Sequence, residues 1–211
     1  MLGSIDTGSL RTVFTDSDPA WIDMRNGDPQ WTEDGEYFSW LSERDGWRHL
    51  FLAPRSGDEA ALLTAGEYDV VELVHIDQEG GWAYVLASPA DPTSRALYRT
   101  RFDGGGQLER ISPEDGGGSH RYQISPGARW ALHTFSSRTQ PPVTELVTLP
   151  EHQVVRTLED NHDLRQALAG VELAEVSNFR VAIGELELDG WMMTPPDFDS
   201  TRKYPLLVYV Y

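Results

Sequence analysis

Three copies of one pattern recur along the chain, and this repeat constrains the fold more than any other feature. Each copy is a turn followed by a run of apolar and aromatic residues: QWTEDGEYFSWLS from Gln30, HIDQEGGWAYVLAS from His75 and QISPGARWALHTFSS from Gln123. The turn glycines, Gly35, Gly80 and Gly127, lie 45 and 47 residues apart. A repeat of about 40–50 residues that supplies several antiparallel strands is typical of a β-propeller blade.

Each copy is followed by two further stretches that alternate as half-buried strands do. The second strands are predicted within 48–57, 95–104 and 144–153, and the third within 60–69, 107–116 and 154–161. Asp-Gly pairs favour tight turns, and Glu43–Trp47 is typical of a hairpin tip. A β-sandwich of similar hairpins is the alternative. The regular spacing favours an all-β partial propeller of about three four-stranded antiparallel blades, with Leu10–Asp16 as the last strand of an earlier blade.

The pattern changes after Glu159. Asn161 can cap a short helix over Asp163–Leu168 that ends at Gly170. Beyond it, Phe179–Met193 alternates and is predicted to turn at Asp189-Gly190, while Tyr204–Tyr211 (YPLLVYVY) is typical of a strand buried on both faces of an α/β sheet. We therefore expect propeller blades over 1–160 and a short helix, a linker hairpin and the first strand of another domain over 161–211.

Composition excludes several classes of function. The chain has no cysteine, which excludes disulfides, thiolate catalysis and cysteine-bound zinc. With 34 acidic and 17 basic residues, its net charge of -17 argues against nucleic acid as a partner and suits a cationic group such as a peptide amino terminus. No apolar run is long enough to span a bilayer, and the first residues lack the pattern of a signal peptide. Cytoplasm and periplasm are both compatible with this composition.

The sequence contains no catalytic constellation. The serine elbow G-x-S-x-G is absent. Ser119 and His120 are adjacent, so on an extended chain they point in opposite directions, and we interpret them as part of a loop between blades. The glycine runs near residues 104–106 and 116–118 are interpreted as turns, because a phosphate cradle needs a following helix. His162-Asp163 and His75 with Asp77 offer too few donors for a metal. Neither a metal nor a cofactor is expected.

Four aromatic residues, Trp31, Tyr37, Trp40 and Trp47, form a stripe near the first repeat. Such a stripe could serve as a platform for a sugar or a peptide. Packing in the core of a blade is the favoured interpretation.

Four stretches resemble the dipeptidyl peptidase IV branch of the prolyl oligopeptidase family, and the similarity covers nearly all of Trp21–Tyr211. They are the WID segment at Trp21, SERDGWRHLFL at Ser42–Leu52, LLTAGEYDV at Leu62–Val70 and PPDFDSTRKYPLLVYVY at Pro195–Tyr211. The second and fourth are the most specific. The resemblance implies a propeller that caps an α/β-hydrolase domain and gates peptide access to a serine nucleophile. Family members release N-terminal dipeptides with Pro or Ala in second position.

The resemblance also implies roles for three residues. Tyr211 aligns with a tyrosine whose hydroxyl is an oxyanion-hole donor, and Met24 and Arg25 fall where family members line the substrate pocket. The family's paired glutamates and its Ser-Asp-His triad have no counterpart in the 211 residues, so we expect the chain alone to be inactive. The expected partner is a peptide with a free amino terminus, bound by the longer parent, and blade edges could support a homo-oligomer.

Two alternatives remain open from the sequence. The chain could be a stand-alone propeller-like module that binds a protein and has no catalytic activity. It could also belong to another branch of the same peptidase family, such as the acylaminoacyl peptidases, because the glutamate pair is absent. The segment SERDGWRHL favours the dipeptidyl peptidase IV branch.

Overall fold

The computed structural model describes residues 1–22, 29–103, 107–114 and 118–210. The chain forms two compact units, Met1–Asn161 and His162–Tyr211. The strands of the first unit pair in antiparallel sheets, and the second unit contains a helix and a hairpin.

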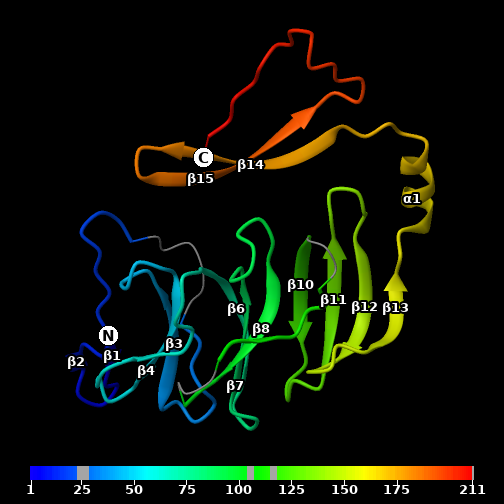
Figure 1. Cartoon of the computed structure of the whole chain (residues 1–211). Helices are drawn as coiled ribbons and strands as arrows, with labels where there is room; N and C mark the ends of the chain where they lie inside the picture. The colour runs from blue at the N-terminus through cyan, green and yellow to red at the C-terminus, as the bar shows by residue number, and fades with distance from the viewer. Residues whose placement is uncertain (23–28, 104–106, 115–117, 211) are drawn as a thin grey trace. The chain divides into compact units, whose positions relative to one another are not determined.

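Three antiparallel sheets follow one another in chain order in the first unit (Figure 1). In each sheet, neighbouring strands are consecutive in the chain. The first sheet consists of β3 (Tyr37–Ser42), β4 (His49–Pro54) and β5 (Ala61–Leu62). The second consists of β6 (Val70–Asp77), β7 (Trp82–Ala87), β8 (Ala96–Arg101) and β9 (Glu109–Arg110). The third consists of β10 (Ser119–Ile124), β11 (Trp130–Ser136), β12 (Val143–Thr148) and β13 (Val154–Glu159).

The turns of the repeat lie where the sequence predicts them. Gly35 and Gly127 have φ angles of 68° and 78° and Gly46, at the tip of the β3–β4 hairpin, one of 97°. These values lie in the region where a side chain is disfavoured, so glycine fits each turn. In the second repeat Gly81, with a φ of 74°, takes this place instead of the expected Gly80.

The second sheet lies between two apolar cores, because successive residues of a strand point to opposite faces. Val85 of β7 packs with residues of the first sheet, such as Leu50, while its neighbour Tyr84 packs with residues of the third sheet, such as Val147. On β8 the same alternation separates Tyr98 from Leu97. Meander sheets stacked face to face in chain order are the arrangement of propeller blades. The first unit is therefore a partial β-propeller.

The N-terminal segment differs from its prediction. The stretch Leu10–Asp16 does not form the last strand of a larger sheet: β2 (Leu10–Arg11) pairs only with β1 (Leu2–Gly3) in a two-stranded ladder. The rest of the stretch lies along the first sheet, where buried Val13 packs with Phe38 and Ala53. It covers the face of the first sheet that the second sheet leaves free.

Two further predictions for the first unit need correction. Within the described residues the first sheet has three strands rather than four, although Trp31 forms an isolated bridge with Phe38. The expected aromatic core stripe is largely at the surface, because Trp31, Tyr37 and Trp47 are each more than 40% exposed. Only Trp40 is partly buried, packed beside Val13 and Phe38.

The second unit consists of α1 (His162–Ala169), β14 (Glu175–Ile183) and β15 (Leu186–Thr194). The predicted helix is present, but the hairpin turns at Gly184 (φ 65°), six residues before the expected turn, so Asp189 and Gly190 lie inside β15. A turn at Gly184 allows both strands to reach nine residues, with Arg180 bonded across to Glu187 and Asp189 at 3.1 and 2.9 Å.

The predicted buried strand at Tyr204–Tyr211 is not formed over the described residues 204–210. These residues pair with no strand, and Leu207 is 92% exposed. An apolar run becomes a buried strand only where neighbouring strands accept its hydrogen bonds. In the part of the chain that the structure describes, no helix is long and apolar enough to cross a bilayer.

Candidate functional site

The β3–β4 hairpin carries the segment SERDGW and forms one wall of a surface hollow. Its tip closes with the Gly46 amide donating to the Glu43 carbonyl at 3.0 Å. The Asp45 carboxylate holds Nδ1 of buried His49 at 2.7 Å, four residues along the chain. The predicted hairpin is confirmed, and the contact of Asp45 with His49 ties its tip to the first residue of β4.

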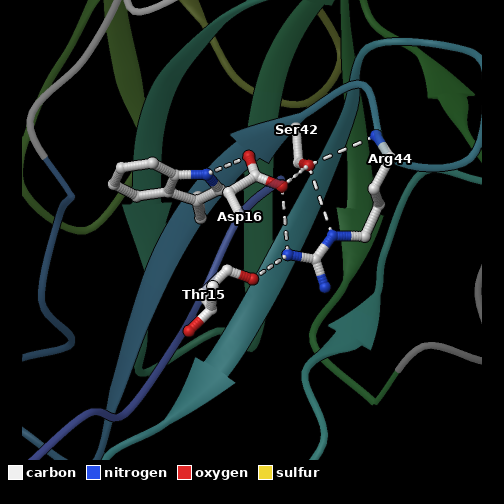
Figure 2. A network of polar contacts seen from close by, with 5 residues as sticks. Thr15, Asp16, Ser42 and Arg44 are labelled. Atoms are coloured by element: carbon white, nitrogen blue, oxygen red, sulfur yellow. Dashed lines mark hydrogen bonds and ion pairs between the residues drawn. The ribbon is translucent and has the colours of Figure 1, made fainter. Parts of the chain in front are cut away.

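Asp16 fastens the N-terminal segment to the same hairpin (Figure 2). Its carboxylate accepts hydrogen bonds from Trp40 Nε1 at 2.9 Å, Ser42 Oγ at 2.7 Å and the Arg44 guanidinium at 3.1 Å. Arg44 also donates to the Thr15 carbonyl at 2.8 Å. The Asp16 carboxylate is therefore held in place beside Ser42 and Arg44 of the hairpin.

Asp16 stays charged in this environment. Burial alone would raise the pKa of its carboxyl, but the hydrogen bonds from Trp40, Ser42 and Arg44 and the charge of Arg44 outweigh burial and lower that pKa. The Arg44 guanidinium lies 4.4 Å from the centre of the Phe14 ring and 5.2 Å from that of Phe51. Such cation–π contacts help to hold the arginine in place.

The hydrogen-bond network of Asp16 borders the hollow. Asp16, Asp18, Trp21 and Ile22 line one side, and the hairpin with Arg48 lines the other. Asp18 Oδ1 accepts the amides of Ala20 and Trp21 at 2.7 and 3.0 Å, which turns the chain so that Trp21 stays 79% exposed. The lining has carboxylates, guanidinium groups and an indole.

The three residues that the sequence selected as site residues, Met24, Arg25 and Tyr211, lie outside the described residues. Trp21 and Ile22, two of the hollow's lining residues, directly precede the segment that contains Met24 and Arg25. Sequence reasoning did not select Asp16 or Arg44. The only signal in the sequence is that Arg44 belongs to SERDGW, and nothing in the pattern pairs it with a residue 28 positions earlier.

The interpretation of Ser119-His120 as a loop is wrong, since both residues lie in β10. His120 points into the interior, is 4% exposed, and bonds to His133 on β11 at 2.9 Å. Among the described residues, no group of three or more His, Asp or Glu side chains is arranged to hold a metal ion.

The chain matches the family model described as the dipeptidyl peptidase IV (DPP IV) N-terminal region over residues 2–142. It is 31% identical over 170 residues to a probable dipeptidyl-aminopeptidase B of Emericella nidulans, a match covering 79% of this chain and 19% of the relative. It is 28% identical over 220 residues to a probable dipeptidyl peptidase 4 of Aspergillus flavus, covering 99% of this chain and 28% of the relative.

A solved structure gives the same result. The crystal structure of Porphyromonas gingivalis dipeptidyl peptidase 4 superposes with a TM-score of 0.73 and 28% sequence identity, covering 84% of this chain and 24% of that chain. The chain thus spans less than a third of the length of each of these three relatives. The matched residues 2–142 include the first two sheets and the hairpin hollow. The chain belongs to the dipeptidyl peptidase IV N-terminal region family.

Proposed function

We propose that the chain is the propeller portion of a longer serine exopeptidase that releases N-terminal Xaa-Pro or Xaa-Ala dipeptides, and that the propeller gates access of the peptide. The match to the family model over residues 2–142 carries the proposal. The relatives from Emericella nidulans and Aspergillus flavus, named as a probable dipeptidyl-aminopeptidase B and a probable dipeptidyl peptidase 4, support it.

We assign residues 1–160 to the propeller and 161–211 to a short helix, a linker hairpin and the first strand of an α/β-hydrolase domain. That strand would form only in the longer polypeptide, where neighbouring strands accept its hydrogen bonds. The division of the chain at Asn161 and His162 supports this assignment. So do the apolar side chains of β14 and β15, such as Phe179 (48% exposed) and Trp191 (52% exposed), which need a covering layer.

Within this scheme Met24 and Arg25 line the substrate pocket. The formal charge of -17 favours a peptide with a positively charged amino terminus. Tyr211 would donate a hydrogen bond to the oxyanion of the tetrahedral intermediate. A preorganised donor of this kind contributes about 3–4 kcal/mol to catalysis.

The chemistry itself needs residues outside the chain. Acyl transfer proceeds through an activated serine with a histidine base, and no G-x-S-x-G segment occurs in the 211 residues. The chain alone would therefore bind or gate, and the hydrolase domain would cleave.

The test compares the 211-residue chain with the longer polypeptide in which it would be followed by a hydrolase domain. Both are assayed with Ala-Pro-p-nitroanilide and with the same substrate N-acetylated. We expect turnover only from the longer polypeptide, only with the free amino terminus, and only until a serine-directed inhibitor is added. Turnover by the short chain, or none by the longer one, would contradict the proposal.

A variant tests the part assigned to the pocket. Arg25→Ala in the longer polypeptide is expected to raise KM for Ala-Pro-p-nitroanilide and leave kcat nearly unchanged, because it removes binding energy shared by substrate and transition state. Arg138→Ala, at an exposed position between β11 and β12, is the matched control. Equal KM values for the two variants would contradict the assignment of Arg25 to the substrate pocket.

A further inference from the structure

Three histidines gather in the third sheet. His120 lies on β10, His133 on β11, and His152 in the turn between β12 and β13. Nδ1 of His120 and Nε2 of His133 are 2.9 Å apart, and their rings are stacked at 5.2 Å with an interplanar angle of 15°. His152 meets the His133 ring edge-on, with ring centres 4.6 Å apart. Both His120 and His133 are less than 5% exposed.

A run of hydrogen bonds connects one of these histidines, His152, to the second sheet through Tyr122, whose ring stacks on that of His133 with ring centres 4.6 Å apart. The hydroxyl of Tyr122 lies 2.8 Å from His152 Nε2 and 2.8 Å from the Ser112 hydroxyl. Ser112 follows β9, and its Oγ accepts the amide of fully buried Leu97 on β8 at 2.8 Å. The run therefore joins a turn of the third sheet to the middle of the second.

The run depends on the charge of the imidazoles. A bond between two ring nitrogens needs one donor and one acceptor, so His120 and His133 cannot both be protonated and keep it. Similarly, Nε2 of neutral His152 can accept a hydrogen bond from the Tyr122 hydroxyl. The Tyr122 oxygen can then accept a hydrogen bond from the Ser112 hydroxyl. Protonation of His152 at Nε2 reverses this direction.

The surroundings oppose protonation. Burial, followed by the charges of His152 and His120, lowers the pKa of His133 to about 3. On β12, Glu145 Oε2 lies 3.9 Å from His133 Nδ1, too far for a hydrogen bond, and that buried nitrogen has no hydrogen-bond partner within the described residues. From β9, Arg110 donates to the carbonyls of Ser112 and Pro113 at 3.0 and 2.8 Å and adds positive charge.

We propose that His120, His133 and His152 form a proton-sensitive latch between the second and third sheets, closed while the imidazoles are neutral and opened locally by protonation in mild acid. An open latch exposes the imidazoles to water, where a histidine takes up a proton near pH 6.5. In the closed latch burial opposes protonation of His133, so a proton taken up at His133 favours the open form. This inference does not depend on the proposed peptidase function.

The first measurement uses the unaltered chain. Imidazole nitrogen spectra recorded from pH 8 to pH 5 report the charge and tautomer of each histidine. We expect the closed form to keep His133 neutral at pH 5.5, with one protonated and one unprotonated nitrogen in the bond to His120. A His133 ring that titrates near pH 6.5 in the folded chain would overturn the proposal.

The second measurement reads the latch directly through amide hydrogen exchange at Leu97. After correction for the intrinsic pH dependence of exchange, the rate should rise about tenfold between pH 7.5 and 5.5, the factor for one histidine excluded from titration in the closed form. Leu50 is the internal reference, because its amide donates to the Thr64 hydroxyl at 2.9 Å at the equivalent place in the first sheet. A rise at Leu97 of less than about threefold, or an equal rise at Leu50, would overturn a local latch.

Two variants distinguish local opening of the latch from a general loss of stability in acid. His133→Gln places an amide where Nε2 lies, so the bond to His120 can persist without a titrating group, and the rise at Leu97 should disappear. His162→Gln changes an exposed histidine on α1 and should leave the rise in exchange rate at Leu97 unchanged. Persistence of the rise in His133→Gln would contradict the proposal. If His133→Gln does not fold, the measurements on the unaltered chain still decide.

Discussion

The first and third sheets are held to their neighbours by polar networks of opposite character. Around Asp16 the network is charged and partly open to water, with the side chains of Asp16 and Arg44 11% and 32% exposed. Around His133 it is buried and neutral. A charged network keeps its strength only while its anion stays ionised, and a neutral network only while its bases stay unprotonated. The two networks should therefore respond to different conditions.

The largest effect is expected from Asp16→Ala. This change removes the acceptor of three hydrogen bonds, from Trp40, Ser42 and Arg44, and leaves a half-buried guanidinium without its counter-ion. The free energy of unfolding, measured in urea, should fall by about 2–3 kcal/mol. Asp6→Ala, at an exposed position near the N-terminus, is the control and should change it by less than about 0.5 kcal/mol. Equal losses in the two variants would show that the Asp16 network does not stabilise the chain.

A smaller loss is expected from Tyr122→Phe in the neutral network. The change removes only the hydroxyl that lies between His152 and Ser112 and keeps the ring in the core. One buried partner, Ser112, and one partly buried partner, His152, lose a hydrogen bond. The free energy of unfolding should therefore fall by about 1–2 kcal/mol. The same loss should be found at low and high salt. Tyr37→Phe, at an exposed tyrosine, serves as the comparison and should have almost no effect.

The smallest effect is the response of the two networks to salt. A double-mutant cycle on Asp16→Asn and Arg44→Gln should give a coupling of about 0.5–1 kcal/mol at low salt, falling by more than half in 1 M NaCl. A cycle on Tyr122→Phe and His152→Gln should give a coupling that does not change with salt. Similar salt dependence in both cycles would remove the contrast between the networks.

The repeat made much of the first unit predictable from its sequence. Glycine at turns such as that of Gly35 and the apolar run of β7 both report local requirements of the backbone and of burial. The second unit was less predictable. The turn at Gly184 and the exposed run ending at Val210 depend on which strands lie beside them, and alternation does not specify a partner.

The two networks could not be found from the sequence. Asp16 and Arg44 are 28 positions apart, and His120 and His152 are 32 apart, so only the tertiary fold brings them together. Ser119 and His120 stand out in the sequence as an adjacent serine and histidine, and not because either is expected to be buried. The alternation that separates their side chains also sends His120 into the interior, and this is the signal that could have shown a buried histidine.

The pH dependence of stability tests the contrast most directly. Burial keeps the folded pKa of His133 at about 3, below the unfolded value of 6.5, so the unfolded chain binds more protons in mild acid. Stability from this site is complete above about pH 6.5 and is lost as the pH falls below it, by about 1.4 kcal/mol between pH 7.5 and 5.5. The pKa of Asp16 is lowered from 3.8, so its contribution is lost only below about pH 4.

The decisive measurement is the free energy of unfolding from pH 8 to pH 5 for the unaltered chain, Asp16→Asn and His133→Gln. We predict that the unaltered chain and Asp16→Asn lose stability in parallel below pH 6.5, and that His133→Gln loses about 1.4 kcal/mol less between pH 7.5 and 5.5. Three parallel curves, or a loss that disappears in Asp16→Asn, would contradict the account.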